Sequence, residues 1–109
     1  MLVNVHKTYR WVVAICDSDL LGKKLEDRPI KPEQSSGNVM AQVDLTGDFF
    51  KGEEKEEEEV KEIVLDAQRE DATFFIVGSE SVELCKKLGL VLGSGVKEVG
   101  GVPVALVLL

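Results

Sequence analysis

The stretch "EKEEEEVKEIVLDAQREDATFFIVGSESVELCKKLGL", residues 54–90, decides the fold because it predicts a helix, a buried strand and a second helix in succession. Its first part carries apolar residues at the three- and four-residue spacing of one helix side, namely Val60, Ile63, Val64 and Ala67. We therefore expect a long helix over Glu54–Glu70. The acidic run at its start is interpreted as a solvated helix face rather than a metal or partner site.

The second part of this stretch predicts a buried strand and a capped helix. Ala72–Val77 is almost entirely apolar, as expected of a strand covered on both faces. Ser79 can cap a helix over Ser79–Leu88, because its hydroxyl can accept a bond from a free backbone N–H group. Gly89 can close the same helix in a left-handed conformation. We expect both helices to flank this strand.

The N-terminal part of the chain predicts two strands followed by a helical turn. Leu2–His6 and Arg10–Cys16 are strand-like, and the second is apolar on both faces, so it belongs at the centre of a sheet. Asp17 or Ser18 can cap a short helix after it. Further on, "VMAQVDL" predicts an edge strand.

The C-terminal stretch "VKEVGGVPVALVLL", residues 96–109, predicts a strand, a Gly-Gly turn and a last strand that is unusually apolar. This last strand has two interpretations. It is either buried within the monomer, which we favour, or an exposed edge that pairs with a second copy to give a homodimer.

Together these segments predict a single α/β domain over residues 1–109, with a mixed β-sheet of about five strands and two main helices packed on it. If the strands around the helix Ser79–Leu88 are parallel, a right-handed crossover through that helix connects them. The Pro, Ser and Gly residues around 27–38 predict a mobile or inserted loop.

Composition argues against several classes of protein. The net charge of −7 disfavours broad non-specific binding to nucleic acid. No apolar run reaches the ~20 residues of a membrane-spanning helix, and the N-terminus lacks a signal peptide, so we expect a cytoplasmic location without membrane contact. Cys16 and Cys85 belong to no Cys-x-x-Cys pair, so no metal site and no cofactor are predicted. Abundant Glu with Lys is typical of thermophiles.

Two weak candidate sites involve helix starts, and each has a simpler structural explanation. The strand-to-helix turn at Gly78 and Ser79 offers free N–H groups to an anion, although every such turn does so and a cap is the simpler interpretation. Asp17 and Asp19 can hold a divalent ion together with another carboxylate, although capping explains them equally well.

A third candidate is basic. His6 and Arg10, with Lys7 and Tyr9 between them, form either a small basic and aromatic patch for RNA or a polar hairpin edge, and we favour the hairpin edge. An RNA-binding surface requires the basic residues of the N-terminal part to gather on one face: Lys7, Arg10, Lys23, Lys24, Arg28 and Lys31.

Four motifs occur in the order and spacing of a known family: "VVAICDSDLLGKKLEDR", "DFFKGEEKEEEEV", "VGSESVELCKKLGLV" and "VGGVP". On these motifs the chain resembles the archaeal family of unknown function number four hundred and twenty-four. The resemblance implies an archaeal cytosolic protein without an assigned enzyme activity, encoded near translation genes. Family members carry polar residues at positions occupied here by Phe75, Ser79, Val104 and Leu106, so this member is expected to lack part of any site built from them.

The sequence and the resemblance together favour a non-enzymatic binding or accessory module, with a link to translation or RNA as the hypothesis for its role. No catalytic set can be assembled around the single histidine, so an enzyme is the less favoured class. The alternative is a small-molecule anion-binding protein or enzyme that uses the turn at Gly78 and Ser79.

Overall fold

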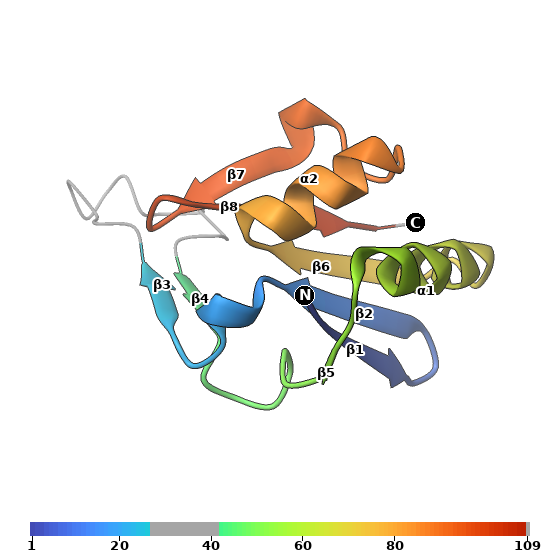
Figure 1. Cartoon of the computed structure of the whole chain (residues 1–109), viewed down its shortest axis with the longest axis horizontal. Helices are drawn as coiled ribbons and strands as arrows, with labels where there is room; N and C mark the ends of the chain where they lie inside the picture. Colours follow the sequence, from blue (N-terminus) through green and yellow to red (C-terminus); the bar gives the residue numbers. More distant parts are fainter. Residues whose placement is uncertain (27–41, 109) are drawn as a thin grey trace.

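The computed structural model describes residues 1–26 and 42–108 (Figure 1). Six strands form one mixed sheet in the order β5-β1-β2-β6-β8-β7. Their bounds are β1 Leu2–Lys7, β2 Trp11–Cys16, β5 Glu53–Glu54, β6 Thr73–Val77, β7 Val96–Val99 and β8 Val102–Val107. A separate pair consists of β3, Lys24–Glu26, and β4, Gln42–Asp44. The predicted α/β class and mixed sheet are therefore confirmed, and the sixth strand, β5, is only two residues long.

The two main helices lie on the same face of the large sheet (Figure 1). They are α1, Glu57–Arg69, and α2, Ser79–Lys87. Val60 and Val64 of α1 and Val82 and Cys85 of α2 are buried with the strand residues of that face in one core cluster. The apolar residues at helical spacing are therefore buried against the sheet, as predicted.

The opposite face is covered only in part. Leu25 of β3 and Val43 of β4 pack on it, together with Leu20, Leu45 and Phe50. These residues bury the strand ends Cys16, Val77, Val99 and Val104 in a second cluster. The β3–β4 pair lies beside the β7–β8 turn, where a Cβ on Gly100 would be 3.2 Å from the backbone nitrogen of Glu26.

Connections follow the predicted hairpins, and α2 connects two parallel strands of one sheet, β6 and β7, which is the condition stated for the predicted crossover. β1 pairs with β2 and β7 pairs with β8 in antiparallel hairpins, and the Gly100-Gly101 turn has positive φ at both residues. β2 and β6 are parallel, so the segment containing α1 joins two parallel neighbours. α2 leads from β6 to β7, and β8 lies between these two strands, antiparallel to both.

Two predicted boundaries change, and the position of the last strand becomes clear. The long helix begins at Glu57 rather than Glu54, because Glu53 and Glu54 pair with β1 as β5. The helical turn after Asp17 is a 3-10 turn over Ser18–Leu20, followed by β3. The apolar last strand is an inner strand, with Ala105 buried but Leu106 46% exposed.

Two further predictions concern the loop around residues 27–38 and the membrane. The mobile or inserted loop predicted around residues 27–38 lies outside the described residues. Within the described ranges, no helix is long and apolar enough to span a membrane.

Candidate functional site

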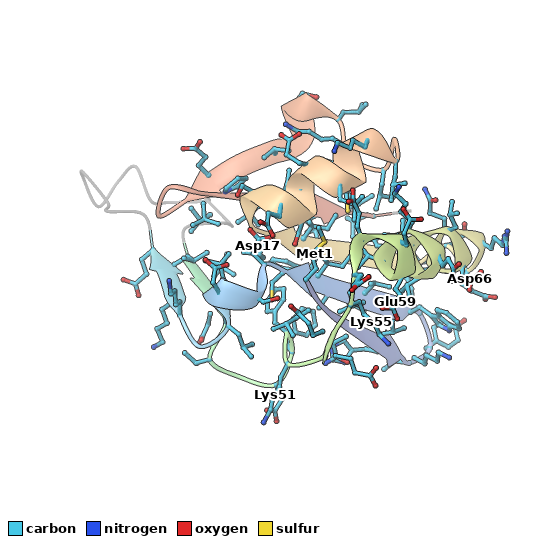
Figure 2. All side chains as sticks on the ribbon, in the orientation of Figure 1. Met1, Asp17, Lys51, Lys55, Glu59 and Asp66 are labelled. Atoms are coloured by element: carbon cyan, nitrogen blue, oxygen red, sulfur yellow. The ribbon has the colours of Figure 1, made fainter. Side chains whose placement is uncertain are left out.

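Asp17 comes directly after β2 and binds the start of α2. We call the carboxyl ends of β2 and β6, where this contact lies, the closed end. One of its carboxylate oxygens accepts the backbone N–H of Ser81 at 2.9 Å and the Ser81 hydroxyl at 2.8 Å. The other accepts the backbone N–H of Glu80 at 3.2 Å. Asp17 is therefore the N-terminal cap of α2, supplied from a distant part of the chain (Figure 2).

This arrangement corrects two predictions about capping. Ser79 does not cap α2, because the N-cap position is Gly78, with φ +112°, and no side chain of the local sequence makes the bond. Asp17 caps a helix as predicted, but not the turn that follows it, where it makes no side-chain cap bond. Gly78 is required there because a Cβ would lie 2.3 Å from the Asp17 carboxyl carbon.

The Asp17 carboxylate occupies the N–H groups of the candidate anion site. An anion at Gly78 and Ser79 would compete with the Asp17 carboxylate for the N–H groups of Glu80 and Ser81. The candidate cation site is also changed, because Asp17 is buried against Ser81 whereas Asp19 is exposed. Within the described residues, no three His, Cys, Asp or Glu side chains gather as potential metal ligands.

His6 takes part in an aromatic cluster. Its Nε2 lies 3.0 Å from the carbonyl oxygen of Phe49, which can only accept, so Nε2 carries the proton. Its ring stacks on Phe49 with centroids 4.8 Å apart, and Phe49 contacts Phe75 edge-on at 6.0 Å. The histidine thus holds the chain around Phe49 against the sheet.

Asn4 reinforces the same contact, and sequence reasoning missed it. Its Nδ2 lies 3.2 Å from each of the carbonyl oxygens of Asp48, Phe49 and Lys51. The available signal was the amide side chain in the otherwise apolar stretch "LVNV". A polar residue on a half-buried sheet face requires such partners.

The predicted basic residues do not gather in one place. Lys7 lies over the Trp11 ring, 4.8 Å from its centroid, and Arg10 ends the same hairpin turn. Lys23 and Lys24 lie beyond the opposite end of β2, at the start of β3 (Figure 1). A six-residue strand separates the two pairs, which is about 17 Å. Arg28 and Lys31 lie outside the described residues.

Neither cysteine is a candidate nucleophile. Both are fully buried. Burial, followed by the negative charge of Asp17, raises the pKa of Cys16 to about 11. Burial alone raises the pKa of Cys85 to about 12. Both thiols stay protonated at neutral pH, and the thiol is a weak nucleophile compared with the thiolate.

The half of the sheet that β3 and β4 leave uncovered has an apolar and aromatic surface. We call it the open sheet face, formed by His6, Val12, Phe49, Thr73, Phe75 and Leu106. The strand register places Val12 opposite both His6 and Thr73, and Phe75 opposite Leu106. Phe49 is 40% and Leu106 46% exposed, and the other four residues are half-buried. Alternation of side chains along strands puts the five strand residues on one face, and Phe49 joins them through its ring contacts with His6 and Phe75.

The open sheet face includes two of the positions at which the family resemblance implied polar groups, Phe75 and Leu106. The other two lie elsewhere: Val104 is buried under the β3–β4 pair, and Ser79 is at the first turn of α2. The four positions do not form one site, and the sheet face itself had no chemical motif by which the sequence could reveal it.

Comparison with known proteins identifies the family but not an activity. The family described as "Protein of unknown function (DUF424)" matches residues 5–109, so the chain belongs to the DUF424 family, as the resemblance predicted. A crystal structure of an uncharacterized conserved protein from Methanopyrus kandleri has a similar fold. The TM-score is 0.76 at 23% identity, covering 98% of this chain and 90% of that one. No curated protein matches the chain.

Proposed function

We propose that this DUF424 protein is a non-enzymatic binding module that holds a partner protein against its open sheet face. The observation that carries the proposal is the unequal covering of one sheet face. The part near Cys16 and Val77 is buried under β3 and β4, whereas Phe49 and Leu106 remain 40% and 46% exposed. A contiguous exposed apolar surface on a small domain marks an interaction site.

The chemistry of the open sheet face favours a protein over a nucleic acid. His6 is the one titratable residue among its six, and the imidazole already contacts Phe49. Nucleic-acid affinity comes largely from Lys and Arg side chains that neutralise phosphates. Aromatic rings without neighbouring cations therefore fit an apolar protein surface better than an RNA strand.

The size of the surface favours one amphipathic helix as the occupant. Stable interfaces between whole proteins involve about 20–30 residues on each side, far more than the open sheet face provides. The same sheet already accepts α1 and α2 on its other face, where their apolar sides pack on strand residues. A partner helix would repeat that packing on the uncovered half.

Among the residues that the structure describes, four chemically versatile groups already have a structural role, which supports a non-enzymatic function. Asp17 caps α2, His6 binds the Phe49 carbonyl, and both thiols are buried and protonated. A catalytic base or nucleophile needs access to a substrate in the correct protonation state. These groups would have to leave their present partners to gain it.

The test is site-specific photo-crosslinking in native cell extract. A photoreactive amino acid replaces Leu106 of the open sheet face, or, as a matched control, Leu65 of α1, which is 49% exposed on the other side of the molecule. We expect one protein to crosslink from position 106 and not from position 65, through an amphipathic helical segment. The purified partner should then bind Leu106→Ser at least tenfold more weakly than wild type, and Leu65→Ser equally well.

Four results would overturn this proposal: equal crosslinking from both positions, crosslinking to a second copy of the chain, ribonuclease-sensitive crosslinks, or an unchanged Kd for Leu106→Ser. The earlier prediction of an RNA or ribosomal partner stays a prediction, and the separation of Lys7 and Arg10 from Lys23 and Lys24 counts against it. Co-sedimentation with ribosomal particles that ribonuclease abolishes would support that alternative.

A further inference from the structure

We infer that the outer edge of β1, from Asn4 to Lys7, binds an extended acidic peptide, which adds to the sheet as an extra strand. This edge adjoins the open sheet face at His6, but it binds through its backbone and takes a ligand of different chemistry. It does not depend on the proposed function. Three observations lead to it: an unpaired strand edge, a groove beside that edge and the charges at its two ends.

The backbone of β1 is paired on its outer side only at its beginning. β5 pairs with Leu2 and Val3 and ends there. The Lys55 N–H binds the Met1 carbonyl at 2.8 Å, so the outward-pointing backbone groups belong to residues 1, 3, 5 and 7. In the part of the chain that the structure describes, no strand pairs with the outer side of Val5 or Lys7.

A close backbone contact fixes the point where the edge opens. A Cβ on Gly52 would lie 2.0 Å from the Val3 carbonyl oxygen, so only glycine allows the chain to pass this near to β1. Beside Gly52, an open groove with a volume of about 610 Å³ lies along the edge. Val5 and Ile63 give this groove apolar walls, and Lys51 lies at its rim. The groove can hold side chains of a strand added at Val5.

The lysine side chains at the two ends of this edge favour an acidic ligand. Lys55 lies 2.9 Å from a Glu53 carboxylate oxygen and 3.7 Å from Glu59, so its charge is already balanced (Figure 2). Lys51 is exposed and makes no ion pair within the described residues. Lys7 lies at the far end of the same edge, where its ammonium group is 4.8 Å from the centroid of the Trp11 ring. Cations at both ends, with Val5 between them, fit a segment that carries acidic residues on either side of an apolar centre.

The other sheet edge and a second copy of the chain fit this chemistry less well. β7 carries exposed Lys97 and Glu98 at its middle, as edge strands that avoid pairing do. Antiparallel pairing of two β1 edges centred on Val5 would place Lys7 opposite Val3, where β5 already pairs. A short peptide from a partner meets neither obstacle.

The probe is a short, capped peptide in which valine and threonine alternate between two terminal glutamates. Backbone amide shifts of the full chain are followed by NMR during titration. We expect saturable binding, with the largest shifts and new protection from hydrogen exchange at Val5 and Lys7. N-methylation of the central valine, which removes one backbone donor, should weaken binding about tenfold. This control leaves the protein unaltered.

Protein variants test the charge part of the inference. Lys51→Glu should weaken binding about fivefold, whereas Lys97→Glu, on the other edge, should leave it unchanged. The inference is wrong if millimolar peptide gives no saturable shift, if the shifts centre on other elements, or if the N-methylated peptide binds equally well. Protection of Val5 and Lys7 that rises with protein concentration, without peptide, would assign the edge to a second copy and also overturn it.

Discussion

The two ends of the β2–β6 strand pair differ in how their side chains are used. At the carboxyl end, Cys16 and Val77 are fully buried and Asp17 binds the start of α2. Toward the other end, Val12 and Phe75 are half-buried and form part of the open sheet face. The end that contains Cys16 and Asp17 therefore has a structural role, and the proposed partner surface lies toward the other end.

The largest effect on stability is expected when the Asp17 carboxylate at the closed end is removed. Asp17→Ala should lower the free energy of unfolding by about 3 kcal/mol, because α2 loses its cap and the buried Ser81 hydroxyl loses its acceptor. Urea unfolding followed by circular dichroism measures the loss. Asp19→Ala, an exposed acid two residues away, should change stability by less than about 0.5 kcal/mol. Equal effects would show that Asp17 is not a structural cap.

The two buried thiols make the free energy of unfolding depend on pH, and this effect is of intermediate size. Both thiol pKa values are raised in the folded chain, to about 11 and about 12 from 9.0, so folding favours the protonated form. The stability they contribute is complete below pH 9 and is lost as pH rises through the folded values. The free energy of unfolding, measured by urea denaturation, should fall by roughly 2 kcal/mol between pH 8 and pH 10.

The double variant Cys16→Ala, Cys85→Ala is the matched control, because it removes the two thiols and changes no other residue. Its unfolding free energy should depend less steeply on pH than that of wild type. Parallel profiles for the two proteins would mean that the thiols are accessible in the fold.

The smallest stability effect is expected on the open sheet face. Leu106→Thr should change the free energy of unfolding by less than about 0.5 kcal/mol, because Leu106 is 46% exposed and threonine is favourable in strands. The thermal midpoint measures this directly. A loss as large as that of Asp17→Ala would mean that Leu106 belongs to the core and is not kept for a partner.

Local patterns predicted the elements well. Helical spacing of valines identified α1, and continuous apolar runs identified β2 and β6, because these signals depend on neighbours in sequence. β5 was missed since two glutamates have no strand pattern of their own and pair only because β1 lies beside them. The position of β8 between β6 and β7 was not predicted, because that pairing forms only when the whole sheet forms.

The site was harder to predict than the fold for the same reason. Asp17 was recognised as a capping residue, but its helix starts 62 positions later in the chain, so local reasoning assigned it to the next turn. The open sheet face depends on how far β3 and β4 extend over the sheet, and this is a tertiary property. Phe49 and Leu106 are ordinary apolar residues in the sequence, and both come next to Phe75 only in the folded chain.

The cap of α2 also has a consequence for the order of folding. Asp17 and Ser81 are separated by 64 residues, so their bonds close a long loop of chain. The β1–β2 hairpin needs only local contacts and can form early, whereas the first turn of α2 stays frayed until β2 and β6 are in register. During synthesis the N-terminal hairpin must therefore wait for most of the chain before its carboxylate finds the helix, which makes the completed α2 a late marker of the native state.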